Sequence, residues 1–96
     1  MAQFDALRVT GDVIVLDCRS DFLGDLPTRF VVPLRPVDRI GLRRLTPIFV
    51  VDGQPLTMLT PLARSIRKRD ILGTVESLIA HEYEIKTALD MLVSGF

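Results

Sequence analysis

The chain ends in a predicted amphipathic helix that runs over residues 78–96. Its apolar residues recur at helical spacing and so share one face. They are Leu78, Ile85, Ala88, Leu89 and Leu92. We therefore expect this face to pack against another part of the structure. The helix finishes in Gly95 and Phe96 without a polar tail, and we expect this end to be presented to a partner.

Upstream of the helix the pattern is that of β-strands. Residues 3–7 and 13–18 form two short runs around Thr10-Gly11-Asp12. The glycine supplies the positive φ that a tight hairpin requires. The sequence therefore predicts an N-terminal hairpin.

A second hairpin is predicted around Asp52-Gly53, a dipeptide that suits a type I′ turn. Its strands are expected over residues 48–51 and 56–59. Pro55 lacks a backbone N–H, which places the start of the second strand at a sheet edge.

Three further segments lie around these hairpins. The sequence predicts a strand over residues 29–34, closed by Pro33, and a loop over residues 24–27. Residues 62–76 fit either a strand with an exposed basic face or a short helix from Pro61, and periodicity does not decide between them. Several short antiparallel strands followed by one helix indicate an α+β domain of the barrel-like type, a single domain over residues 1–96.

Composition favours a soluble chain with a partner subunit. Hydrophobic residues make up 48 % of 96 residues with a mean hydropathy of +0.33, which is high for a small monomer, so we assign the surplus to an interface. No apolar run approaches the roughly 20 residues that span a bilayer. Residues 1–5 do not resemble a secretory signal, and Cys18 is the only cysteine. We therefore expect a cytoplasmic protein.

Charge is distributed in three blocks although the net charge is zero. Residues 1–28 carry five acidic and two basic side chains, a net charge of −3. Residues 29–69 carry nine basic and two acidic side chains, a net charge of +7, and residues 70–96 carry five acidic and one basic, a net charge of −4. The basic middle either meets an acidic partner or a nucleic acid, or pairs with the acidic ends of the chain.

No catalytic or metal-binding pattern is visible. His81 and Cys18 are each the only residue of their type and lie on different predicted elements. They are too few for a zinc site, which needs about four nitrogen or sulfur ligands. Glu82 and Glu84 lie two apart on a helix and point to different faces. We expect no cofactor or metal, a solvated or capping role for His81, and a core position for Cys18.

Segments along nearly the whole chain resemble one protein family. They are Gln3-Phe4, Ser20-Asp21-Phe22-Leu23, Val32-Pro33-Leu34, residues 45–50 and the helix end over residues 84–96. Their order and approximate spacing are similar to those of the CcdB toxins, plasmid-addiction proteins that poison DNA gyrase. The chain departs from the family at Ser94, where the best-known toxin has a tryptophan before the terminal glycine, and at Asp90, where the family has a neutral amide.

The resemblance implies an SH3-like antiparallel β-barrel with a C-terminal helix. It also implies a homodimer whose helices lie near the twofold axis, and the apolar helix face that contains Leu78, Ile85, Leu89 and Leu92 agrees with such an interface. The implied activity is binding rather than catalysis: the toxin holds the gyrase A subunit, traps the cleaved DNA complex and is neutralised by a CcdA-like antitoxin. No direct contact with nucleic acid and no membrane is required.

Candidate contacts follow from the same resemblance and from charge. The gyrase-binding residues that it implies are Phe22, Leu23, Thr87, Asp90, Val93, Ser94, Gly95 and Phe96. The basic segment offers an antitoxin docking site through Arg64, Arg67, Lys68 and Arg69. For Val93 and Phe96 the alternative is packing into the core or the dimer interface.

Two alternative functions remain open. One is a ribonuclease toxin of the MazF or PemK type, which shares the barrel fold, with Arg29 beside Thr28 or Arg64 beside Ser65 as the catalytic pair. The other is an attenuated homologue that binds an antitoxin and not gyrase, because serine does not replace the stacking area of tryptophan.

Overall fold

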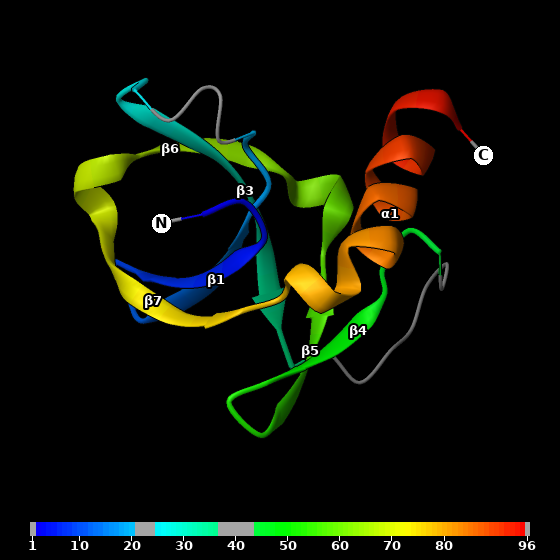
Figure 1. The fold of residues 1–96 in the computed structure, drawn as a ribbon, viewed down its shortest axis with the longest axis horizontal. Helices are drawn as coiled ribbons and strands as arrows, with labels where there is room; N and C mark the ends of the chain where they lie inside the picture. The colour runs from blue at the N-terminus through cyan, green and yellow to red at the C-terminus, as the bar shows by residue number, and fades with distance from the viewer. Residues whose placement is uncertain (1, 21–24, 37–43, 96) are drawn as a thin grey trace.

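The structure is a computed structural model that describes residues 2–20, 25–36 and 44–95 (Figure 1). The strands in this part of the chain form one curled antiparallel sheet with the order β4-β5-β3-β2-β1-β7, and β6 pairs with β3 beside this path. Their bounds are β1 Asp5–Val9, β2 Val13–Asp17, β3 Thr28–Arg35, β4 Ile48–Val51, β5 Gln54–Met58, β6 Arg64–Arg67 and β7 Ile71–Ser77. One α-helix, α1 (Glu82–Ser94), follows the sheet. The predicted α+β class, an SH3-like barrel with a C-terminal helix, is confirmed.

Both predicted hairpins are confirmed. Asp52 and Gly53 have φ values of 51° and 78°, as a type I′ turn requires, and they join β4 to β5. Gly11 and Asp12 also have positive φ, at 93° and 59°, and they lie between Val9 and Val13, which pair across the turn. Local turn chemistry therefore fixes the register of both hairpins.

The middle strands bury side chains on both faces of the sheet. On the face toward α1, Leu16 and Val32 pack with Ile85 of the helix. On the opposite face, inside the curl, Val15 and Val31 form a second core with Leu7. This explains why β2 and β3 are nearly continuous apolar runs, since a strand covered on both sides has no polar alternation.

The first strand begins later than the sequence predicts. Gln3 and Phe4 lie in a turn, and Phe4 has a φ of 70°. Its N–H donates to the carbonyl of Asp17 at 2.6 Å, and its carbonyl accepts from the N–H of Leu78 at 2.8 Å. These two bonds and full burial of the ring hold Phe4 in a backbone conformation that phenylalanine seldom adopts.

The prediction that Pro33 closes its strand is wrong, because β3 continues to Arg35. Pro33 pairs with Val15 of β2, and its carbonyl accepts from the N–H of Leu59 at 2.9 Å. The missing N–H of proline lies on the same side as that carbonyl, where β5 has just ended at Met58. The hydrogen-bond ladder between β3 and β5 therefore loses a bond only at the end of β5.

Residues 62–76, which the sequence left open, contain two strands. β6 and β7 are joined by η3 (Lys68–Asp70), a single turn of 3-10 helix, and η2 (Thr60–Leu62) precedes β6. The alternative of a short helix from Pro61 is reduced to η2, a single 3-10 turn. β7 pairs with β1 along its length, so a strand late in the sequence completes the sheet beside the first.

The predicted helix consists of η4 (Ile79–His81), a 3-10 turn, followed by α1. Leu78, Ile85 and Ala88 are buried against the domain's own sheet, and Leu89 packs beside them. Leu78 and Ile85 are therefore used inside the chain and are not available to a dimer interface, whereas Leu92 is exposed and the homodimer stays a prediction. In the described part of the chain, no helix is long and apolar enough to cross a membrane.

Candidate partner-binding site

Helix α1 presents a row of side chains away from the domain. Thr87, Asp90 and Ser94 follow one another at intervals of three and four residues, and so share one face of the helix. This face is opposite the buried Ile85 and Ala88. The structure thus brings three of the predicted contacts together. Tyr83, four residues before Thr87, begins the same row and is 79 % exposed. We call Tyr83, Thr87, Asp90 and Ser94 the outward stripe.

Tyr83 is the residue of this surface that sequence reasoning missed. The available signal was its spacing of four from Thr87, which puts an aromatic ring beside the predicted contacts. The two residues are also connected, because the Thr87 hydroxyl donates to the carbonyl of Tyr83 at 2.9 Å. An exposed tyrosine is a common anchor at protein interfaces.

The last turn of α1 exposes apolar side chains. Val93 is 85 % exposed and Leu92 is 40 % exposed. The alternative that Val93 packs into the core of its own domain is therefore wrong. Gly95 ends the helix with a φ of 81°, and its N–H donates to the carbonyl of Met91 at 2.9 Å. Glycine adopts this left-handed conformation without a Cβ clash, so the chain turns sharply where the candidate surface ends.

A hollow of about 230 Å³ lies beside the outward stripe. It is lined by Arg44, Pro47, Tyr83, Glu84 and Thr87, so the segment before β4 forms its other wall. Such a hollow beside an exposed tyrosine can receive one side chain of a partner.

The end of α1 is electronegative. The last turn carries no basic side chain, so nothing on the helix compensates the partial negative charge of its final carbonyl groups. Asp90 is exposed close to this end, while Lys86 pairs at 2.9 Å with Glu82, one turn nearer the start of the helix. A partner that binds here is expected to offer a basic group to Asp90.

The predicted antitoxin site lies on the other side of the molecule, where β6 is at the upper left of Figure 1 and α1 at the right. Arg64 and Arg67 are the two ends of β6, and Lys68 and Arg69 continue into η3. The three arginines are exposed and Lys68 is half-buried. We call these four residues the basic rim. A hollow of about 410 Å³ lies between Arg67, Lys68, Arg69 and the start of β3.

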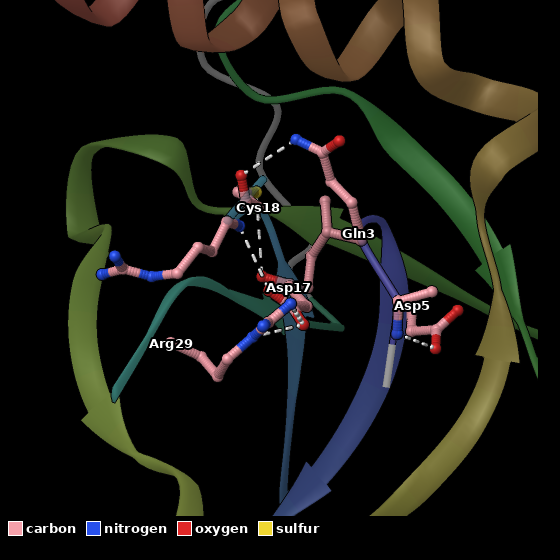
Figure 2. Close-up of polar contacts among 8 residues, drawn as sticks. Gln3, Asp5, Asp17, Cys18 and Arg29 are labelled. Atoms are coloured by element: carbon pink, nitrogen blue, oxygen red, sulfur yellow. Dashed lines mark hydrogen bonds and ion pairs between the residues drawn. The ribbon is translucent and has the colours of Figure 1, made fainter. Parts of the chain in front are cut away.

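Arg29 does not belong to this surface. It is 2 % exposed, and it donates from Nε and Nη2 to Oδ2 of Asp17 at 2.9 and 2.6 Å (Figure 2). The other oxygen of Asp17 accepts from the N–H of Arg19 at 3.1 Å. For this arginine, pairing with the acidic N-terminal block is the correct alternative.

This geometry disfavours both catalytic pairs of the ribonuclease alternative. Arg29 is buried and bound by Asp17, so its guanidinium is not presented to an RNA phosphate. Arg64 and Ser65 are consecutive residues of β6, and successive side chains of a strand point to opposite faces.

Cys18 and His81 have structural surroundings. Burial and the neighbouring charge of Asp17 raise the pKa of the Cys18 thiol from 9.0 to about 12, which keeps it protonated, as expected of a core cysteine. The ring of His81 packs on Phe49 with centroids 4.8 Å apart. His81 precedes α1 but makes no capping bond with its side chain. Within the described residues, no group of three or more histidine, cysteine or acidic side chains is placed to hold a metal ion.

Three predicted contacts, Phe22, Leu23 and Phe96, lie outside the described residues. The remaining ones divide into the outward stripe with Val93 and Gly95, and the basic rim on the opposite side. A model of one protein family, described as CcdB protein, matches residues 3–95. The chain belongs to the CcdB family. It is thus a toxin of the toxin–antitoxin type.

The CcdB fold of this chain is shared with a solved protein. A structure described as the crystal structure of an Mtb toxin superposes with a TM-score of 0.75, over 95 % of this chain and 99 % of that one. The two sequences are 17 % identical, so the likeness concerns the fold. No curated protein sequence matches the chain.

Proposed function

We propose that this CcdB-family chain binds the A subunit of DNA gyrase through the outward stripe and the end of α1, and thereby traps the complex in which DNA is cleaved. The observation that carries the proposal is the exposure of Val93 at the end of a helix that is held to the domain by its buried face. An apolar side chain held out by a rigid helix loses little entropy on binding and can act as an anchor.

In this proposal the protein acts by binding and does not catalyse a reaction. The outward stripe supplies hydroxyl groups from Tyr83, Thr87 and Ser94, and a carboxylate from Asp90, around the apolar end. That mixture is typical of an interface with an apolar centre and a polar rim. A homodimer would present two such ends, related by a twofold axis, to the symmetric A subunits. A cognate antitoxin reverses the inhibition.

The direct test is a pull-down with purified gyrase A beside a DNA-cleavage assay. Val93→Asp should weaken gyrase binding at least about tenfold and abolish the cleaved complex, because it places a second carboxylate beside Asp90. Leu72→Asp is the matched control, since Leu72 is also an exposed aliphatic residue and lies on β7, away from α1. Equal inhibition by both variants and the unmodified protein would place the active surface elsewhere.

Two changes at the end of the chain extend this test. Deletion of Gly95 and Phe96 should abolish binding and leave the unfolding midpoint nearly unchanged, because the deletion lies beyond the last turn of α1. Ser94→Trp should raise binding and toxicity, since tryptophan adds about 200 Å² of contact area. A steep loss of stability in the deletion would favour a packing role for Phe96.

The test also separates the alternatives. A protein that binds the antitoxin but not gyrase is an attenuated homologue if Ser94→Trp restores its binding to gyrase. Growth arrest that persists in a host with resistant gyrase, and that is accompanied by cleavage of RNA, identifies a ribonuclease. Sedimentation at tens of micromolar measures the dimer, and a monomer at that concentration contradicts the twofold arrangement.

A further inference from the structure

Strand β6 has one paired edge and one edge that points out of the sheet. It pairs with β3 in the register Thr28 to Arg67 and Val31 to Arg64. The N–H of Lys68 donates to the carbonyl of Pro27 at 3.0 Å, which continues the same register by one residue. In an antiparallel pair, residues whose N–H and C=O face the partner strand alternate with residues whose groups face away.

This alternation assigns the backbone groups of β6. Because Lys68 faces β3, residues 66 and 64 also face it. The N–H and C=O of Ser65 and Arg67 therefore point outward, where no strand of the described part of the chain pairs with them. Leu16 of β2 pairs with Val32, and the N–H of Cys18, just after β2, donates to the carbonyl of Phe30 at 2.8 Å. The other edge of β3 is therefore occupied, and β6 ends the sheet on this side. An edge of this kind is a template for one more strand.

The side chains around this edge are basic. Arg64, Arg67 and Arg69 are exposed, and none of them forms an ion pair with another described residue. Thr28 lies opposite Arg67 and lines the hollow of about 410 Å³ beside the strand. Charged residues on an edge discourage pairing with identical chains, and here they also select for a strand of opposite charge.

We infer that the outward edge of β6 accepts an extended acidic segment of a partner protein as an additional strand, with the basic rim holding its carboxylates. The inference rests on the proposed function for the identity of that partner, the cognate antitoxin. A peptide matches both features of the edge, since its backbone completes the ladder at Ser65 and Arg67 and its acidic side chains meet the arginines. Nucleic acid would match the charge and leave the backbone groups of the edge unpaired.

The sharpest variant is Ser65→Pro, which removes an outward N–H and keeps every charge. Residue 65 does not donate to β3, and β-structure before proline is favoured, so the pairing with β3 should persist. We expect Ser65→Pro to weaken binding of the antitoxin tail at least about tenfold. Ser65→Ala, which keeps the N–H and removes the hydroxyl group, should bind like the unmodified protein.

A second variant tests the charge. Arg67→Gln should weaken the same binding severalfold and reduce its dependence on salt concentration. Arg35→Gln is the matched control, because Arg35 is an exposed arginine at the far end of β3, and it should have no effect. Far-UV circular dichroism and urea midpoints would verify that all variants fold.

The first probe is a synthetic peptide of alternating glutamate and threonine, with its lysine counterpart as a control. The second probe is an acidic peptide from the tail of a cognate antitoxin. Hydrogen exchange should show the amides of Ser65 and Arg67 protected by the acidic peptides and not by the lysine peptide. Unchanged binding by Ser65→Pro, or protection elsewhere in the chain, overturns the strand addition.

The outcomes also separate this inference from the proposed function. Protection at β6 by the acidic peptides in a protein that does not bind gyrase contradicts the proposed function and supports the inference. Gyrase inhibition that the antitoxin reverses through another surface supports the proposed function and contradicts the inference. Binding of short duplex DNA that depends on Arg67, without binding of either acidic peptide, assigns the edge to nucleic acid and overturns the inference.

Discussion

Arg29 and Arg67 lie on paired strands, with Arg67 opposite the residue that precedes Arg29, yet they occupy opposite environments. Arg29 is enclosed and bound twice to one oxygen of Asp17, while Arg67 is exposed on the basic rim. A buried charge must be compensated within the fold, whereas an exposed one is stabilised by water. One basic block in the sequence therefore contains both a buried arginine that stabilises the fold and exposed arginines that are available to a partner.

The largest expected effect comes from uncoupling the buried pair. Arg29→Met should lower the free energy of unfolding by about 3 to 5 kcal/mol, because it leaves the Asp17 carboxylate buried without its cation. Arg67→Met should change it by less than about 0.5 kcal/mol, as is usual for a surface substitution. Urea unfolding measures both, and the double variant Asp17→Leu with Arg29→Met should recover much of the loss. Equal losses of unfolding free energy in Arg29→Met and Arg67→Met would contradict the distinction between a buried and an exposed arginine.

The two halves of α1 extend the same contrast to apolar side chains. Ile85→Ala should cost about 2 to 4 kcal/mol, since it removes a fully buried side chain between the helix and the sheet. Val93→Ala should cost less than about 0.5 kcal/mol, because Val93 is already in water. If thermal unfolding showed that Val93→Ala is the more costly change, Val93 would be packed in the protein's assembled form.

The pH dependence of stability tests the buried environment of Cys18. The folded state raises the pKa of this thiol from 9.0 to about 12, so folding favours the protonated form. The resulting stability is fully present below about pH 9 and is lost as the pH rises from 9 toward 12, with a slope of up to about 1.4 kcal/mol per pH unit.

Urea midpoints between pH 8 and pH 11 measure this dependence. Cys18→Ala should flatten the part of the curve that belongs to the thiol. A variant with the same slope as the unmodified protein would show that Cys18 is ionised as readily in the fold as in the unfolded chain.

The smallest effect is expected at two glycines on the surface. Gly95→Ala should cost about 1 kcal/mol, because its φ of 81° forces a Cβ into the left-handed region. Gly73→Ala should be neutral or slightly stabilising, since Gly73 lies in β7 without a positive φ and a Cβ there would meet no atom within 4 Å. A calorimetric midpoint lowered equally in both would show that backbone conformation is not the cause.

The elements that sequence reasoning predicted are those that local chemistry determines. The hairpins at Gly11 and Gly53 and the buried face of the helix depend on residues close together in the chain. β7 was not separated from β6, because its pairing with β1 joins residues more than 60 positions apart and leaves several exposed side chains without a strand pattern. The turn at Phe4 depends on Asp17 and Leu78, which no local signal connects to it.

The candidate site was predictable to a similar degree. The resemblance to CcdB toxins indicated Thr87, Asp90 and Ser94, and helical spacing brings them to one face. It did not indicate Tyr83, although the spacing of four residues from Thr87 places the ring on the same face. The assignments of Phe22, Leu23 and Phe96 stay predictions. The burial of Arg29 depends on the register that brings β3 beside β2, which composition cannot reveal.

The contact between Phe4 and Leu78 has a consequence for synthesis. The first strand pairs with β7, and the turn before it is bonded to the residue that leads into the helix. A chain emerging from the ribosome therefore carries an incomplete sheet until residues 71–78 have been added. Helix α1, which carries the surface that we propose for gyrase, follows these residues in the chain. The order of synthesis thus places the last strand of the sheet and the proposed gyrase surface after most of the sheet has been made.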